Sequence, residues 1–251
     1  MIRVAAVGDV HVGADVRAFA DVSTEHLAAS ADVLLLAGDL TQHGSLDEAT
    51  LLAQELSGAP LPVVAVLGNH DYHQGQQHQI RGALEAVGVS VLEGEGVVLT
   101  ISGVRLGIAG VKGFGGGFLG ACGSEFGEDE MKAFMQHSRL TAERLEAALK
   151  QLDCEVRVAL THYSPVPGTL NGERQEIYPF LGSYLLGEAI DKCACAAAFH
   201  GHAHAGSERS LTPGGVPVRN VARPVIKLAY KTYTIRSSPG ELEGTRSEAA
   251  P

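Results

Sequence analysis

The fold and the function are both indicated most strongly by one stretch, Val64-Ala65-Val66-Leu67-Gly68-Asn69-His70-Asp71-Tyr72. An apolar run of strand length leads through a glycine into an amide, an imidazole and a carboxylate. Ligands bind at the carboxyl ends of strands in α/β sheets, so polar groups at such a place favour a functional site. Asn, Asp and Gly also form ordinary turns, and the tetrapeptide alone is equally compatible with a turn.

Other apolar runs in the chain end in the same way. In chain order, the polar residues at strand ends are Asp9 and His11 after residues 2–7, Asp39 after 33–37, Asn69 and His70 after 62–67, His162 after 155–160, and His202 with His204 after 193–199. A single histidine after a strand is more often a solvated or hydrogen-bonded loop residue than a ligand. Five strand ends of the same character predict one shared site.

The first ninety residues alternate between strand and helix patterns, which predicts parallel strands joined by right-handed crossovers. Ser45 to Glu48 form a capping box that begins a helix ending near Ser57. Residues 97–101 and 104–111 flank Ser102-Gly103, a hairpin signal, so the sheet is predicted to be mixed. The fold class is therefore α/β with mixed sheets.

The second half of the chain continues this pattern. We expect an amphipathic helix over 138–152, an irregular segment over 166–183, and closing antiparallel strands over 217–221 and 232–236. Residues 237–251 are rich in Gly, Glu, Ser, Ala and Pro, and we expect them to be disordered. One domain over 1–236 is predicted, because the chain shows neither an internal repeat nor a linker.

Composition narrows the classes of partner. The 251 residues are 45% hydrophobic and carry a net charge of −10, which disfavours nucleic acid, and the absence of Trp argues against a base-stacking platform. Four cysteines without a signal-like start or a long apolar span favour a reducing compartment away from the membrane, with the cytoplasm as the expectation. Cys193 and Cys195 resemble part of a metal site, but no second cysteine pair completes one, and buried thiols are the favoured interpretation.

Residues 112–137 read as a glycine-rich loop with apolar residues that a solvated linker would not carry. Phe114, Phe118, Phe126 and Phe134 are costly to leave in water, so we expect them to be buried. The favoured interpretation is a lid insertion beside the site, with Lys112 or Lys132 available for a remote anionic group. A surface loop or a subunit contact is the alternative, and the sequence does not indicate an oligomeric state.

The residues at the strand ends also predict the kind of ligand. Carboxylate, amide and imidazole groups without a thiolate suit manganese, iron or zinc, with cobalt and nickel as alternatives. The number of such groups exceeds what one metal ion needs. A carboxylate can bridge, so the count favours two ions about 3.5–4 Å apart that share a water molecule.

These motifs, Asp-x-His, Gly-Asp, Gly-Asn-His-Asp, a lone His and Gly-His-x-His in that order, resemble those of the calcineurin-like metallophosphoesterases. The resemblance covers roughly residues 2–236, and it implies a four-layer αββα sandwich. It also implies the ligand sets: Asp9, His11 and His204 for one metal, and Asn69, His162 and His202 for the other. Asp39 would bridge the two ions.

The same resemblance implies the reaction. His70 would protonate the leaving oxygen, Asp71 would orient His70, and Asn69 and His70 would contact the phosphate, which a metal-bridging hydroxide would attack. His200 lies outside the pattern, as a structural or supporting residue. Gly-Asn-His-Asp also occurs in the branch that includes bacterial cyclic-nucleotide phosphodiesterases, so a small-molecule phosphodiester is the favoured substrate. A phosphomonoesterase acting on nucleotides or small phosphates, a nuclease, and an inactive scaffold that binds protein partners are the alternatives.

Overall fold

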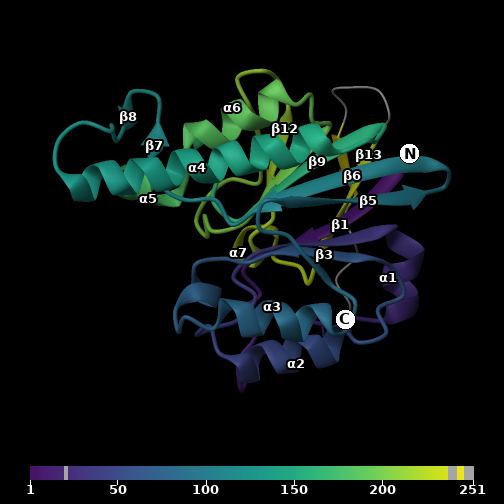
Figure 1. Cartoon of the computed structure of the whole chain (residues 1–251). Coiled ribbons are helices and arrows are strands. Elements are labelled where there is room, and N and C mark those ends of the chain that lie inside the picture. The colour runs from purple at the N-terminus through teal and green to yellow at the C-terminus, as the bar shows by residue number, and fades with distance from the viewer. Residues whose placement is uncertain (20–21, 237–241, 246–251) are drawn as a thin grey trace.

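The computed structural model describes residues 1–19, 22–236 and 242–245, and Figure 1 shows their arrangement. Within these residues the longer strands form two six-stranded sheets, and a short pair forms a two-stranded ribbon. Helices cover the outer side of each large sheet (Figure 1). The expected α/β fold with four αββα layers is therefore confirmed.

The first sheet has the strand order β14-β13-β1-β2-β3-β4. Its strands are β1 (Ile2–Val7), β2 (Val33–Ala37), β3 (Val63–Val66), β4 (Ser90–Val91), β13 (Lys231–Ile235) and β14 (Leu242–Thr245). The strands β1 to β4 run parallel, while at one edge β13 pairs antiparallel with β1 and β14 pairs antiparallel with β13. The expected mixed sheet is confirmed.

The second sheet has the order β11-β12-β10-β9-β6-β5. Its strands are β5 (Glu95–Ile101), β6 (Val104–Val111), β9 (Val156–Thr161), β10 (Ala197–His200), β11 (Arg209–Leu211) and β12 (Pro217–Asn220). The predicted hairpin is β5 with β6. The prediction that residues 217–221 form an antiparallel closing strand is wrong in part, because β12 pairs parallel with β10 and antiparallel with β11.

The helices lie in two outer layers and at the strand ends. They are α1 (Thr24–Ser30), α2 (Leu46–Leu56), α3 (Gln77–Glu85), α4 (Asp129–Gln151), α5 (Tyr178–Leu181), α6 (Tyr184–Lys192) and α7 (Arg223–Ile226), with short 3-10 turns η1 (His70–Tyr72), η2 (Pro167–Leu170) and η3 (Gln175–Ile177). Ser45 caps α2 with the predicted capping box. The expected irregular segment 166–183 contains η2, η3 and α5.

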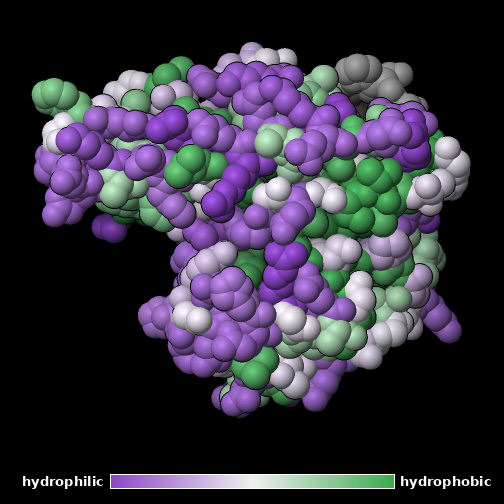
Figure 2. All heavy atoms as spheres, viewed as in Figure 1, coloured by the Kyte–Doolittle hydropathy of each residue, from purple (hydrophilic) through white to green (hydrophobic). Residues whose placement is uncertain are grey.

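The helix predicted to begin at Ser138 begins nine residues earlier, at Asp129, so the loop prediction is wrong for residues 129–137. Asp129 and Glu130 occupy the first turn, where acidic side chains interact favourably with the helix dipole. Met131, Phe134 and Met135 extend the helical pattern at spacings of three and four. Hydrophilic residues cover much of the outer surface of this helical layer (Figure 2).

The core explains why the buried strands are apolar throughout. Along β2, Leu34 and Leu36 face α1 to α3, whereas Leu35 and Ala37 face the second sheet. Successive side chains of a strand point to opposite faces, so a strand between two apolar layers needs hydrophobic residues at every position. A third cluster, which includes Leu145 of α4, packs on the outer face of the second sheet.

The end of the chain departs from the predicted disorder at one place. Residues 242–245 form β14, which pairs antiparallel with β13, so the prediction is wrong for these four residues. The rest of 237–251 lies outside the described residues, and the domain boundary at residue 236 stays a prediction. Among the helices of the described segments, none has the length and apolar character required to cross a membrane.

Candidate metal centre

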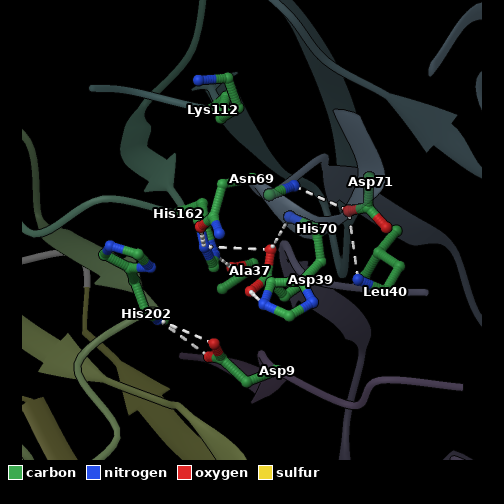
Figure 3. Close-up of polar contacts among 12 residues, drawn as sticks. Asp9, Ala37, Asp39, Leu40, Asn69, His70, Asp71, Lys112, His162 and His202 are labelled. Atoms are coloured by element: carbon green, nitrogen blue, oxygen red, sulfur yellow. Dashed lines mark hydrogen bonds and ion pairs between the residues drawn. The ribbon is translucent and has the colours of Figure 1, made fainter. Parts of the chain in front are cut away.

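The predicted ligands meet at one edge of the sandwich, as Figure 3 shows for most of them. The strands β1, β2 and β3 are parallel neighbours in the first sheet, and β9 and β10 are parallel neighbours in the second. Because parallel strands end at the same edge, the residues that follow them come together. The strand ends contribute Asp9 and His11, Asp39, Asn69 and His70, His162, and His202 with His204.

Four of these residues have left-handed backbone conformations. The φ angles are 57° at Asp9, 45° at His11, 50° at Asp39 and 70° at His202. Such angles are uncommon outside glycine and cost about 1–3 kcal/mol each. The surrounding hydrogen bonds hold the strained turns, including Asp9 N–H to the Gly38 carbonyl at 2.9 Å and His11 N–H to the Asp39 carbonyl at 3.0 Å.

Glycines beside the ligands make room for the carboxylates. A Cβ atom at Gly68 would lie 2.1 Å from Oδ1 of Asp39, and one at Gly201 would lie 2.4 Å from Oδ2 of Asp9. Both separations are far below van der Waals contact. At these two strand ends, glycine is therefore required by the close approach of a carboxylate.

The first ligand group contains Asp9, His11 and His204, whose ligand atoms lie within 4.8 Å of one another. Nε2 of His204 is 2.8 Å from Oδ1 of Asp9. The backbone N–H of His202 donates to both Asp9 oxygens, at 3.1 and 2.9 Å, and holds the carboxylate in place. These are the three residues expected to hold the first metal.

The second group contains Asp39, His162 and His202, again within 4.8 Å of one another. Nε2 of His162 lies 3.3 Å from Oδ1 of Asp39 and 2.9 Å from Oδ1 of Asn69. Nε2 of His202 lies 3.2 Å from the carbonyl oxygen of Phe180, so this nitrogen carries the proton and Nδ1 is available as a donor of electrons. The expected second set is therefore assembled.

The position of the ring proton of His162 indicates whether the second ligand group suits a cation. Nδ1 of His162 lies 2.9 Å from the carbonyl oxygen of Ala37, which can only accept a hydrogen bond, so the ring proton is on Nδ1. Nε2 then presents a lone pair to the oxygens of Asp39 and Asn69. Converging lone pairs repel one another unless a positive charge lies between them. The donor set therefore fits a metal ion.

The hydrogen bond to Asp9 raises the pKa of His204, whereas burial is the largest influence on the pKa values of Asp9, His11, His162 and His202. It raises the pKa of Asp9 to about 6, although the His204 hydrogen bond lowers it. It lowers the pKa of His11, lowers that of His162 well below its ordinary value, and lowers that of His202 to about 3. These histidines are neutral at pH 7, which is the state that binds metals. Two buried carboxylates, Asp9 and Asp39, then need positive charge nearby.

His70 lies at the edge of both groups. Its Nε2 is 3.9 Å from Oδ2 of Asp39, and His11, Asp39 and His70 form a third set with ligand geometry. Nδ1 of His70 lies 2.8 Å from the carbonyl oxygen of Gln42, which fixes the proton there. The His70 side chain is 44% exposed, more open than Asp39 at 2%. Its role as a proton donor rather than a ligand stays a prediction.

Asp71 is held by several hydrogen bonds. Its carboxylate accepts hydrogen bonds from the backbone of Gly68, Leu40 and Thr41, and from the Thr41 hydroxyl. The short turn η1 aims Asp71 into the protein, where it is fully buried. The His70 ring contacts the Gln42 carbonyl oxygen through Nδ1, and the role of Asp71 in orienting His70 stays a prediction.

His200 is a supporting residue, in agreement with its place outside the motifs. It is fully buried; its Nδ1 lies 2.7 Å from the Gly201 carbonyl oxygen and its Nε2 lies 2.8 Å from Oγ1 of Thr169. A neutral ring satisfies both contacts, by donating to the carbonyl and accepting from the hydroxyl. His200 therefore steadies the loop that carries His202.

The segment 112–137 lies only partly beside the site. Gly113, Phe114 and His137 line a cavity that also includes Asn69. Phe118 packs in a separate buried cluster, and Phe126 is 87% exposed, so the expected burial of the aromatics is wrong for Phe126. The lid function stays a prediction.

Two residues near the site were not predicted. Glu93 lies shortly after the end of β4, as the predicted ligands lie after other strands. This position after a strand is the feature of the sequence that could have identified it. Tyr163 directly follows His162, and its ring centroid is 4.4 Å from that of His202. The sequence could not identify the backbone carbonyl oxygens of Gln42 and Phe180 as parts of the site, because every residue has a backbone carbonyl group.

The αββα fold thus brings together two groups of side chains that could hold metal ions, with Asp39 close to both. The calcineurin-like phosphoesterase model matches residues 2–206, and the chain belongs to this family. The protein is accordingly a metal-dependent phosphoesterase.

Solved structures share the fold at low sequence identity. A phosphopantetheinyl hydrolase from Mycobacterium tuberculosis is 17% identical, with a TM-score of 0.60, over 87% of this chain and 88% of its own. The protein TT1561 of Thermus thermophilus is 18% identical, with a TM-score of 0.60, over 97% of this chain and 98% of its own. These likenesses concern the fold alone. No curated protein matches the sequence.

Proposed function

We propose that the protein is a phosphodiesterase that uses two metal ions and acts on small-molecule substrates. The observation that carries the proposal is the position of Asp39. Its Oδ1 lies 3.3 Å from Nε2 of His162, and its Oδ2 lies 3.8 Å from Nε2 of His11. A carboxylate that presents one oxygen to each ligand group suits two ions that share a ligand.

The proposed ligand sets are those expected from the sequence. Asp9, His11 and His204 hold one ion, and Asn69, His162 and His202 hold the other. Two bound cations supply positive charge that polarises a phosphoryl group and lowers the pKa of a water molecule. Manganese, iron and zinc suit these oxygen and nitrogen donors best.

The chain itself supplies two further groups. The Asn69 amide nitrogen can donate to a phosphate oxygen while the amide oxygen faces His162. His70 is open to solvent, and when doubly protonated its Nε2 can donate a proton to the leaving oxygen, because Nδ1 is held by Gln42.

The diester preference is supported by the aspartate that closes Gly-Asn-His-Asp, a form found in the family branch with cyclic-nucleotide phosphodiesterases. An inactive scaffold is disfavoured, because such a protein should have lost ligands and all seven predicted ligands are present. The phosphopantetheinyl hydrolase of Mycobacterium tuberculosis shares the fold, and this likeness does not identify the substrate of the present protein.

The proposal is tested by metal analysis together with two nitrophenyl substrates. After loading with Mn²⁺ and gel filtration, elemental analysis should give two ions per chain, and the chelator EDTA should remove both the ions and the activity. The value of kcat/KM should be higher for bis(p-nitrophenyl) phosphate than for p-nitrophenyl phosphate. The surface variant Asp153→Asn serves as the matched control, because that side chain is 88% exposed. One ion per chain, or preference for the monoester, contradicts the proposal.

A further inference from the structure

A cavity of about 430 Å³ adjoins the metal-ligand cluster. Asn69 and Tyr163 belong to its wall, and these two residues also contact His162. Figure 3 places Lys112 on the side of the site where Asn69 and His162 lie. The full lining is Asn69, Tyr72, Glu93, Lys112, Gly113, Phe114, His137, Thr141, Arg144 and Tyr163. A phosphate at Asn69 would therefore have its organic substituent within reach of this cavity.

Lys112 is the most unusual group in the cavity. Its ammonium lies 5.2 Å from the ring centroid of Tyr72 and 5.1 Å from the centroids of Phe114 and Tyr163. Three rings hold the cation at one place through cation–π attraction. Nζ makes a hydrogen bond to the Gly113 carbonyl at 3.1 Å, whereas an ammonium has three N–H donors. The other two N–H donors make no hydrogen bond with the described residues.

Glu93, the acidic residue that lines the cavity, accepts no hydrogen bond from the Lys112 ammonium in the described part of the chain. Oε1 of Glu93 accepts from the backbone N–H of Lys112 at 3.3 Å, and Oε2 accepts from the Tyr72 hydroxyl at 3.1 Å. Both carboxylate oxygens are therefore occupied by groups other than the Lys112 ammonium. Glu93 steadies the wall and offsets only one positive charge.

A second cation also lines the cavity. Arg144 on α4 is exposed, and it makes neither a hydrogen bond nor an ion pair with any of the residues that the structure describes. His137, about two helical turns earlier, also lines the cavity, and its ring lies against Phe114 at a centroid distance of 4.5 Å. Lys112 and Arg144 carry two formal positive charges against the single negative charge of Glu93. The cavity is therefore suited to an anionic group.

We propose that this cavity binds a second anionic group, a phosphate or a carboxylate, carried on the organic part of the phosphoester, with Lys112 and Arg144 as its partners. The inference rests on the proposed function and names the class of substrate. It also assigns Lys112, which begins the predicted lid segment, as a residue that determines specificity.

Three matched nitrophenyl phosphodiesters test the inference. Their second ester group is propyl, carboxyethyl or phosphonoethyl, so they differ only in the distal charge. The wild-type kcat/KM should be about tenfold to a hundredfold higher for an anionic ester than for the propyl ester, the range that one charge-assisted contact supports. The relative rates of the two anionic esters identify carboxylate or phosphate as the preferred group.

Variants assign the preference to the cavity. Lys112→Met keeps the length of the chain and removes the charge, so the anionic preference should collapse, and Arg144→Gln should reduce it. Lys132→Met is the control: Lys132 also lies in the 112–137 segment, but its Nζ is 3.5 Å from Asp129 and it does not line the cavity. Arg144 is exposed, so its variant carries the test should Lys112→Met fail to fold. Equal rates on all three esters in the wild-type protein, or full preference in both variants, overturns the inference.

Calorimetry separates this inference from the proposed function. Ethane bisphosphonate should bind the Mn²⁺-loaded protein at least about tenfold more tightly than ethylphosphonate, and Lys112→Met should remove the difference. If no ester is hydrolysed but this difference is seen, the proposed function fails and the anion site stands. If esters are hydrolysed but the bisphosphonate has no advantage, the anion site fails alone.

Discussion

Replacement of Asp71 by asparagine should destabilise the protein rather than disable His70. Oδ1 of Asp71 accepts from the Thr41 N–H at 2.8 Å and from the Thr41 hydroxyl at 2.6 Å. Oδ2 accepts from the Gly68 N–H at 2.7 Å and the Leu40 N–H at 3.1 Å. The carboxylate thus ties the turn after β3 to the turn after β2, which carries Asp39 (Figure 3).

The loss of stability in Asp71→Asn follows from the number of hydrogen-bond donors that surround this side chain. An asparagine has one oxygen, and its NH₂ group can only donate. The less costly arrangement keeps the oxygen toward Gly68 and Leu40, lets the Thr41 hydroxyl rotate to accept, and leaves the Thr41 N–H unpaired. A buried unpaired donor costs about 1–3 kcal/mol, and the remaining bonds lose their charge, so the total is about 2–4 kcal/mol. For a chain of this size, the melting temperature should fall by about 5–15 °C.

Urea and thermal unfolding, followed by circular dichroism in EDTA at pH 8, measure this cost. Asp71 is ionised there, because burial, its largest influence, raises the pKa only to about 6. Thr41→Val removes only the hydroxyl contact and should cost less, while the exposed Asp153→Asn should change stability by less than about 1 kcal/mol. A stable Asp71→Asn protein that loses activity chiefly on poor leaving groups would refute the reasoning and support a direct role toward His70.

Three further changes probe the metal centre. Asp39→Asn should lower the content of both ions and reduce kcat at least about a hundredfold, because one carboxylate serves both groups; two retained ions with normal turnover would contradict this. His70→Ala should keep both ions, measured by elemental analysis, and slow alkyl esters about 10²–10⁴-fold but nitrophenyl esters much less; equal losses would count against proton donation. Gly201→Ala should lose the ion that Asp9 is proposed to hold, because the added Cβ would lie 2.4 Å from its Oδ2, whereas Gly82→Ala in α3, where an added Cβ meets nothing within 4 Å, should keep full metal content.

Strand positions and ligand types were readable from the sequence, because each depends on a local pattern. The strands before Asp9, Asp39 and Asn69 are apolar at every position, since both faces of the first sheet are covered. Parallel strands end at one edge, so polar residues after several strands predict a shared site without knowledge of any distance. The family motifs then supplied the ligand sets.

The predictions from the sequence were wrong where a local pattern is compatible with two different structures. Residues 129–137 have the spacing of a helix, but their aromatics and the glycines before them suggested a loop. The direction of β12 could not be read either, because an apolar strand pairs in either direction and its neighbours are chosen by the whole sheet. Phe126 shows that an aromatic residue does not by itself imply burial.

By itself, then, the sequence determined the α/β class, the strand ends that carry the candidate ligands and the residue types of those candidates, because strand period and residue type are properties of neighbouring residues. The tertiary structure decided which atoms meet. It alone placed Asp39 between the two groups, gave Asp71 to the backbone of Leu40 and Thr41, and enclosed Lys112 among three rings. Each of these contacts joins residues that are distant in the chain, and their distances depend on how the two sheets pack rather than on any local pattern.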